Sequence, residues 1–277
     1  MSKVWFVTGA GSGIGAGIVK AALKFGDHVV ATGRNLDKVR QAFGPETEKL
    51  ALLKLDVTDE TQAKEAVAQA VQRFGRIDVL VNSAGYSLLG NFEELTIPDM
   101  DRLFATNFWG VAYVMRAALP VMRKQRSGHI INISSTAGAV GLKHCSAYSA
   151  TKFAVEGLSL ATATELGQFG IKITLVEPGF FLTGLLAASS AKYADSTIPD
   201  YAAEGTAEAM WSPYDGKQTG SPDKLGEAVI ELTRMANPPN VFVGGSDGLA
   251  LVVPAIEARL KDMHDHDALS RSTDIAT

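Results

Sequence analysis

The segment KVWFVTGAGSGIG (3–15) decides the fold, because it joins a short apolar run to a glycine-rich turn and then to a helical pattern. The apolar run is typical of a buried strand, and the helical pattern continues to Phe25, where Gly26 ends it. Glycines in such a turn let backbone N–H groups and the helix N-terminus approach a pyrophosphate closely. The turn has the spacing T-G-x-x-x-G-x-G and predicts a dinucleotide-binding loop formed by Thr8, Gly9, Gly11, Ser12, Gly13, Ile14 and Gly15.

Short apolar runs alternate with helical patterns along the rest of the chain. We predict strands over 3–8, 28–33, 50–56, 77–85, 129–134, 172–179 and 240–245, and helices over 14–25, 36–43, 58–74, 99–123, 146–168 and 223–236. Uniformly apolar strands indicate a parallel sheet that is buried on both faces, and right-handed crossovers then give a doubly wound fold.

The 277 residues are therefore expected to form one α/β domain of Rossmann type, with a seven-stranded, mainly parallel sheet and helices on both faces. Residues 184–222 interrupt the alternation at the carboxyl end of a strand, which is where an α/β enzyme places a substrate lid. Residues 249–277 are expected to form a C-terminal helix and tail.

Composition limits the classes of function. The formal net charge of −4 provides no general attraction to nucleic acid or to anionic membranes. The single cysteine, Cys145, rules out an intrachain disulfide and fits a reducing compartment. The apolar run near the N-terminus is too short for a signal peptide or a membrane span, so we expect a cytoplasmic protein. His264 and His266 do not share a helix face and have no evident third ligand, so no metal site is predicted.

The end of the second predicted strand indicates which dinucleotide binds. An acidic residue at this place hydrogen-bonds the adenosine ribose and favours NAD, but the sequence here is Thr32-Gly33-Arg34-Asn35. The guanidinium of Arg34 is suited to a 2′-phosphate, because it can bind phosphate through two parallel hydrogen bonds. We therefore expect NADP(H) rather than NAD(H), the other interpretation being that Arg34 is only a solvated loop residue.

Three side chains predict proton chemistry beside the cofactor. Tyr148 and Lys152 are four residues apart in a helical pattern and so share one helix face. A phenol with a pKa of about 10 is a poor base near neutrality, and a neighbouring ammonium favours its ionised form. Ser135 ends the fifth predicted strand, and strand ends of a parallel sheet converge on the ligand crevice. Its hydroxyl could hydrogen-bond a substrate oxygen.

These motifs resemble, in order, those of the classical short-chain dehydrogenase/reductase family over residues 3–183. TGAGSGIG (8–15) resembles the family's cofactor loop, and NSAG (82–85) resembles its N-N-A-G motif with serine for the second asparagine. That motif mainly stabilises the central sheet in the family. The resemblance implies further cofactor contacts by Asp56, Val57, Asn82, Ala84, Tyr148, Lys152, Pro178, Gly179, Phe181 and Thr183.

The resemblance also implies catalytic roles. Tyr148 would be the general acid in reduction and the general base in oxidation, and Ser135 would orient the substrate oxygen. Lys152 would lower the pKa of Tyr148 and bind the nicotinamide ribose, and Asn107 would support a water-linked proton relay to Lys152. The helices predicted over 99–123 and 146–168 resemble those of the family's oligomer interface, which implies a homodimer or homotetramer.

The sequence thus predicts an NADP(H)-dependent oxidoreductase that interconverts a carbonyl and an alcohol on a small, largely apolar substrate. The substrate pocket is expected to include Tyr86, Ser87, Leu88, Leu89, residues 140–145, Phe180, Leu185, Leu186, Trp211 and Tyr214. Two alternatives remain open. One is reduction of another bond, or epimerisation, on the same fold; the other is a non-catalytic NADPH sensor, which the presence of serine, tyrosine and lysine disfavours.

Overall fold

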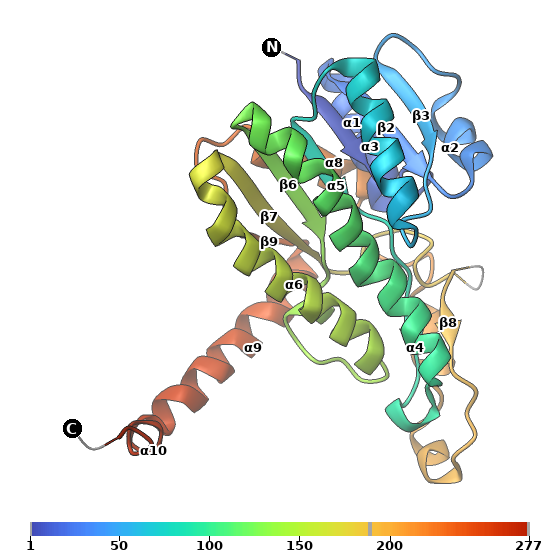
Figure 1. Ribbon diagram of the computed structural model, residues 1–277. Helices are drawn as coiled ribbons and strands as arrows, with labels where there is room; N and C mark the ends of the chain where they lie inside the picture. Colours follow the sequence, from blue (N-terminus) through green and yellow to red (C-terminus); the bar gives the residue numbers. More distant parts are fainter. Residues whose placement is uncertain (1, 188–189, 276–277) are drawn as a thin grey trace.

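A seven-stranded sheet forms the centre of the molecule. The computed structural model describes residues 2–187 and 190–275, and Figure 1 shows their arrangement. The strands lie in the order β3-β2-β1-β4-β6-β7-β9, and every neighbouring pair is parallel. Their bounds are β1 Val4–Val7, β2 His28–Gly33, β3 Leu50–Lys54, β4 Val79–Asn82, β6 Gly128–Ile133, β7 Ile171–Pro178 and β9 Val241–Gly244. The predicted doubly wound fold with seven strands is confirmed.

Helices cover both faces of this sheet. The helices of one face are α1 (Gly13–Phe25), α2 (Leu36–Phe43) and α8 (Pro222–Leu232); those of the other are α3 (Glu60–Phe74), α5 (Gly110–Gln125) and α6 (Ser146–Leu166). Successive residues of β1 alternate between the two layers: Trp5 and Val7 pack against the first, and Phe6 against the second. All three side chains are fully buried, so each face of the strand has an apolar core.

The long helix predicted over 99–123 is divided in the structure. It consists of α4 (Ile97–Phe104), one π-helical turn (Ala105–Trp109) and α5, which together form an uninterrupted rod. Thr96 caps α4 by accepting a hydrogen bond from the Asp99 amide at 3.2 Å. A π turn inserts one extra residue, and such turns occur mostly at functional sites. Periodicity alone does not reveal it.

The insertion 184–222 is more ordered than the sequence predicts, although residues 188–189 lie outside the described structure. Its strand β8 (Lys192–Tyr193) pairs in parallel with β5 (Leu88–Leu89), and the short helix α7 (Ala207–Trp211) follows. The ends of the insertion are joined by a bridge between Phe181 and Gly220, in which the Leu182 amide donates to the Gly220 carbonyl at 2.7 Å. The bridge therefore holds the two ends of the insertion side by side.

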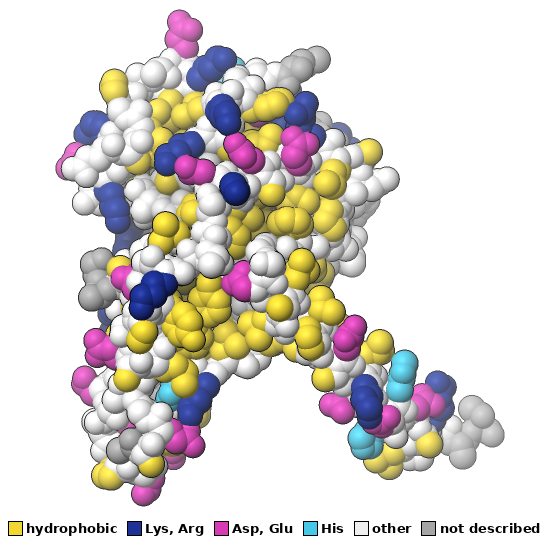
Figure 2. Space-filling model, turned by 180° about the vertical axis from the view of Figure 1, so that it is seen from behind, with side chains coloured by type: hydrophobic (Ala, Val, Ile, Leu, Met, Phe, Trp, Pro, Cys, Tyr) yellow, Lys and Arg dark blue, Asp and Glu magenta, His cyan; other side chains and the backbone are white. Residues whose placement is uncertain are grey.

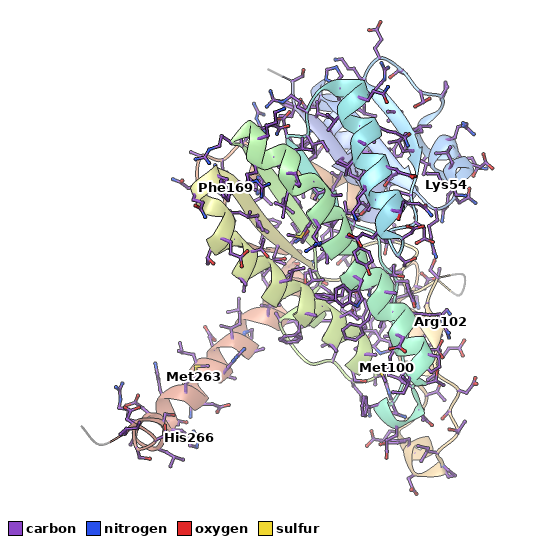
Figure 3. All side chains as sticks on the ribbon, viewed as in Figure 1. Lys54, Met100, Arg102, Phe169, Met263 and His266 are labelled. Atoms are coloured by element: carbon purple, nitrogen blue, oxygen red, sulfur yellow. The ribbon has the colours of Figure 1, made fainter. Side chains whose placement is uncertain are left out.

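Helix α9 (Ser246–Asp265) projects away from the rest of the molecule and continues into α10 (Asp267–Arg271). Figure 2 shows apolar side chains along this arm, and Figure 3 places Met263 and His266 at its outer end, far from the sheet. Among its described residues, only Gly248 and Val252 are buried. None of the helices in residues 2–187 and 190–275 has the length and apolarity that crossing a bilayer requires.

Helices α1 and α8 touch backbone to backbone. A Cβ atom on Gly17 would lie 2.2 Å from the Pro222 carbonyl oxygen, and one on Gly226 would lie 2.4 Å from the Gly17 carbonyl oxygen. Both distances are far below van der Waals contact, and both obstacles are backbone atoms that cannot rotate away. These two glycines therefore fix the distance between the helices.

We expect Gly17→Ala and Gly226→Ala each to lower the free energy of unfolding by about 1–3 kcal/mol, the usual range for overpacking. The control is Gly157→Ala, in the middle of α6, because a Cβ there would meet nothing within 4 Å. Alanine favours a helix over glycine by about 1 kcal/mol, so this control should be neutral or stabilising. Urea denaturation of the three variants checks the prediction, and equal effects at all three positions would contradict it.

Candidate active site

A long cleft runs along the carboxyl edge of the sheet, where the ends of six strands meet. It is bordered by the segments after β1, β2, β3, β4, β6 and β7 and by the first turns of α6. The sequence-predicted residues that line this cleft are Gly9, Ser12, Gly13, Ile14, Arg34, Val57, Ala84, Ser135, Tyr148, Lys152, Pro178, Gly179, Phe181 and Thr183. Segments far apart in the sequence are thus brought together in one site.

The turn after β1 has the shape that a pyrophosphate requires. Gly9 and Gly13 have φ angles of 65° and 56°, in the left-handed region that favours glycine. A Cβ on Gly9 would lie 2.8 Å from the Ala84 Cα, so the turn can pass this closely only without a side chain. Ser12 precedes α1, and its hydroxyl caps no amide of the described chain. The N–H groups of the first helical turn therefore face the cleft and can bind an anion.

Positive charge is concentrated at the adenosine end of the cleft. Arg34 and Lys38, next to the carboxyl end of β2, both line it. Among the described lining residues there is no Asp or Glu. A dinucleotide in this cleft would therefore meet cations, and no carboxylate, where its 2′ position lies.

Tyr148 and Lys152 lie on the buried face of α6. Their side chains are 8% and 6% exposed, and the Lys152 ammonium lies 5.7 Å from the centre of the Tyr148 ring. The Lys152 Nζ donates a hydrogen bond of 2.9 Å to the Ile133 carbonyl oxygen at the end of β6. Ser135 lies two residues beyond that strand, at the start of the turn Thr136–Gly138, and lines the same cleft. A phenol, an ammonium and a hydroxyl therefore meet around one reaction space.

Asn107 lies in the π turn, behind the cleft and not on its wall. Its amide Nδ2 donates to the Tyr86 carbonyl at 3.0 Å and to the Thr151 hydroxyl at 3.2 Å, and its Oδ1 accepts from the Tyr86 amide at 3.1 Å. A Cβ on Gly85 would lie 3.2 Å from the Asn107 Oδ1 and 3.9 Å from the Lys152 Nζ. Asn107 thus holds the segment after β4 in place beside Lys152.

Comparison with known proteins decides the family. The family model described as short chain dehydrogenase matches residues 3–194. The chain belongs to the short-chain dehydrogenase family. It is 37% identical over 260 residues to oxidoreductase BOA17 of Botryotinia fuckeliana, covering 93% of this chain and 94% of that protein. This short-chain dehydrogenase is accordingly an oxidoreductase.

Solved structures agree with this assignment. A short-chain dehydrogenase from Streptomyces avermitilis superposes with a TM-score of 0.90 at 34% identity, covering 99% of both chains. ElxO, determined with NADP bound, has a TM-score of 0.73 at 32% identity and covers 91% of this chain and 99% of its own.

Six residues predicted for the site do not line the cleft of this short-chain dehydrogenase: Thr8, Gly11, Gly15, Asp56, Asn82 and Asn107. The Thr8 hydroxyl accepts hydrogen bonds from the Ser83 and Ala84 amides at 3.0 and 3.2 Å, and so supports the wall from behind. The Asn82 side chain donates to Asn132 at 2.8 Å between neighbouring strands, so its side chain links the sheet, and its contact with the cofactor stays a prediction.

The remaining three positions also have structural surroundings. A Cβ on Gly15 would lie 2.6 Å from the Gly9 carbonyl oxygen, and a Cβ on Gly11 would lie 3.5 Å from Lys38 and Val39. The Asp56 carboxylate accepts hydrogen bonds from the Thr58 amide and hydroxyl at 3.0 and 2.8 Å. These residues shape the cofactor loop and its neighbour without forming the surface of the cleft.

The pKa of Tyr148 differs from the sequence-based expectation. We expected the Lys152 ammonium to lower it, but burial raises the pKa of Tyr148 to about 12, against a smaller lowering by the Ser135 hydroxyl. Burial also lowers the pKa of Lys152 to about 8, opposed by the Glu156 carboxylate. In the protein by itself, desolvation therefore dominates the pKa of both groups, and the phenol holds its proton at neutral pH.

The part of the cleft beyond Tyr148 is largely apolar. Tyr86, Ser87, Leu89, Leu142, Cys145, Phe180, Leu185, Leu186 and Trp211 line it as predicted, whereas Leu88, Val140, Gly141, Lys143, His144 and Tyr214 do not. Tyr214 instead stacks on Phe180 at 5.5 Å between ring centres, and Trp211 stacks on the same ring at 6.0 Å. The lid therefore contributes an aromatic wall to this end of the cleft.

Sequence reasoning missed three polar residues near the site. Gln218 of the lid lines the cleft, and no motif marks it. Glu156 and Glu177 are buried carboxyl groups, 8% and 4% exposed. Glu156 could have been noticed, because it follows Lys152 by four residues and so lies on the same face of α6. In the described residues, no three His, Cys, Asp or Glu side chains are grouped as a metal site requires.

The buried ammonium predicts a pH dependence of stability. Burial lowers the pKa of Lys152 to about 8 in the folded protein, from the ordinary 10.5 of a lysine exposed to water, so the unfolded chain binds more protons between these two pH values. The free energy of unfolding should therefore rise with pH across this window, by up to about 3 kcal/mol from this group. Below pH 8 the ammonium opposes folding by a constant amount.

We expect Lys152→Met to lose this rise. Urea denaturation between pH 7 and 10.5 measures the difference in unfolding free energy between the wild type and the variant, and it should grow in favour of the wild type above pH 8. Lys24→Met is the control, because that side chain is 78% exposed and solvent screens its charge. A wild-type to Lys152→Met difference that is constant across this range would contradict the prediction.

Proposed function

We propose that this enzyme transfers hydride between NADP(H) and the carbonyl or alcohol carbon of a small, uncharged, largely apolar substrate. The proposal rests mainly on one observation: Ser135, Tyr148 and Lys152 lie together in the cleft that also contains the glycine-rich turn after β1. NADPH, when bound, supplies the hydride for reduction, and NADP⁺ accepts it in oxidation.

The residues of the chain manage the proton. In reduction, the Tyr148 hydroxyl donates its proton to the substrate oxygen as that oxygen gains negative charge, and a phenol that is protonated at neutral pH is prepared for this role. The Ser135 hydroxyl orients the same oxygen. The Lys152 ammonium stabilises the phenolate left on Tyr148, because opposite charges attract strongly in a buried site. In oxidation the same groups act in reverse.

Arg34 supports the preference for NADP(H). Its guanidinium lines the cleft beside β2, where a 2′-phosphate would lie, and ElxO shows NADP bound on the same fold. Asn107 would position Lys152 and Tyr86 through the backbone contacts described above. Because the only charged side chains among the described lining residues are Arg34, Lys38 and Lys152, and Lys152 lies beside Tyr148, the part of the cleft beyond Tyr148 provides no charged partner for a substrate.

We expect Arg34→Leu to weaken NADPH binding about tenfold or more, since a hydrogen bond to a charged group contributes roughly 1.5–3 kcal/mol. NADH binding should change less than about threefold, because NADH has no 2′-phosphate to lose a partner. Arg40→Leu is the matched control: Arg40 is exposed on α2, which begins two residues after Arg34, pairs with Asp37 and does not line the cleft. Fluorescence titration with both nucleotides measures the effect, and equal losses for the two would reject the assignment.

We expect Tyr148→Phe to reduce NADPH-dependent turnover of uncharged ketones and aldehydes by at least about 100-fold, the usual contribution of a general acid. NADPH affinity should stay within a few-fold, because only the hydroxyl group is removed. The absorbance of NADPH follows turnover, and nucleotide fluorescence follows binding. Tyr113→Phe serves as the control, since Tyr113 lies on α5 away from the cleft.

The same experiment separates the alternatives. A panel that includes imines as well as carbonyls identifies the bond that is reduced. Wild-type enzyme that binds NADPH but turns over no member of the panel would favour a non-catalytic sensor, and Tyr148→Phe with undiminished turnover would overturn the role given to the phenol.

A further inference from the structure

A second group of buried polar side chains lies near Lys152, and of its members only Ser134 also lines the cleft. Glu156 follows Lys152 by one turn of α6, Ser134 is the residue after β6, and Glu177 lies near the end of β7. Ser134, Glu156 and Glu177 are 3%, 8% and 4% exposed. The proposed proton chemistry uses none of these three residues.

Each of the three carries an oxygen without a visible partner. The Ser134 Oγ, one Glu156 carboxylate oxygen and one Glu177 carboxylate oxygen are buried and accept or donate no hydrogen bond within the described residues. Burying unpaired polar atoms is costly, and carboxyl groups are almost never buried without a charged partner. A set of this kind needs a functional or electrostatic explanation.

Gly138 shows that the Ser134 and Glu156 oxygens face one common space. A Cβ placed on Gly138 would lie 2.6 Å from the Ser134 Oγ, 3.2 Å from the Glu156 Oε1 and 3.2 Å from the Lys152 Cβ. The hydroxyl, the carboxylate and the root of the lysine side chain therefore surround the same point. Any residue larger than glycine would displace them, so the 3₁₀ turn Thr136–Gly138 leaves this space to the polar groups.

The buried carboxyl groups can balance the positive charge of Lys152. The ammonium is buried, and a buried charge is stable only beside an opposite one. Of the elements packed against this part of α6, the turn Thr136–Gly138 carries no ionisable side chain, and β7 contributes Glu177. The Asp247 carboxylate, at the start of α9, accepts a hydrogen bond of 2.6 Å from the Phe180 amide and lies beside Gly179. On α4, Arg102 and Asp99 pair with each other near the surface.

The pKa values are consistent with one negative charge in the pair of carboxyls. Burial and the proximity of Glu156 raise the pKa of Glu177 to about 7, so Glu177 is largely protonated below that pH. Glu156 is the charge that raises the pKa of Lys152 against the effect of burial. Burial raises the pKa of Glu156 as well, and the Lys152 ammonium opposes that rise, so the charged forms of Glu156 and Lys152 favour each other.

We propose that Glu156 is a positioning residue for Lys152: its carboxylate is the buried counter-charge that keeps the ammonium protonated beside Tyr148. It acts across the interior space at Gly138, where the low polarity of the surroundings lets a charge act over several ångströms. Without it, Lys152 would become a neutral amine near neutral pH. The phenolate of Tyr148 would then lose its stabilising partner.

Nuclear magnetic resonance of protein labelled with [13Cε]lysine measures the titration of Lys152 directly, its signal being the one that Lys152→Met lacks. We expect a midpoint near pH 8 in the wild type. In Glu156→Gln it should fall by about one pH unit or more, because one unit corresponds to about 1.4 kcal/mol of lost interaction. Glu156→Asp, which keeps the charge, should restore most of the wild-type value.

Two further variants sharpen the test. Glu165→Gln removes an exposed carboxylate from the same helix and should leave the midpoint unchanged. Glu156→Met removes the polar group altogether, and it replaces Glu156→Gln in the test if the buried amide prevents folding. A Lys152 midpoint that is the same in these Glu156 variants as in the wild type would overturn the proposal.

The consequence for activity rests on the proposed function. The alkaline limb of the pH profile for NADPH-dependent ketone reduction should move toward acid in Glu156→Gln, so that turnover at pH 8 falls about tenfold relative to its own plateau. A purely structural role would lower turnover equally at all pH values, and that result would count against the proposal. If the Lys152 midpoint moves but no protein, wild type included, reduces carbonyls, the proposed function fails and the role of Glu156 stands.

Discussion

The buried positive charge of Lys152 is the constraint around which this site is organised. An ammonium in the interior needs polar partners, and the fold provides a hydrogen bond to the Ile133 carbonyl at the end of a strand and, in our proposal, the charge of Glu156 one helical turn further along. It must also have space. Gly85 on one side and Gly138 on the other lack the side chains that would fill it. The end of a strand, the spacing of residues along α6 and two glycines thus together accommodate the charge of Lys152.

Much of this arrangement could be predicted from the sequence, because it depends on local patterns. Each of the seven strands is a short, uniformly apolar run, and such runs are recognisable when both faces of a sheet are buried. The pairing of Tyr148 with Lys152 follows from helical spacing alone. Arg34 was placed at the cleft because a strand end in a parallel sheet has a known position relative to the ligand.

The rest depends on burial and packing, which the sequence does not display. The π turn at Ala105–Trp109 keeps the apolar periodicity of an ordinary helix, so its extra residue is invisible until Asn107 is seen bound to the Tyr86 backbone. The raised pKa of Tyr148 arises from desolvation, which only the folded chain produces. Asn82 was assigned to the cofactor by motif, but its neighbour in space is Asn132.

The bridge between Phe181 and Gly220 marks the boundary between the insertion and the part of the fold that carries Ser135, Tyr148 and Lys152. The segment between these residues leaves and returns at nearly the same point, and α8 follows at once, locked against α1 at Gly17. Descendants of this protein can therefore lengthen, shorten or exchange the segment without moving a strand. Evolution of new substrate preferences on this scaffold needs no redesign of its chemistry.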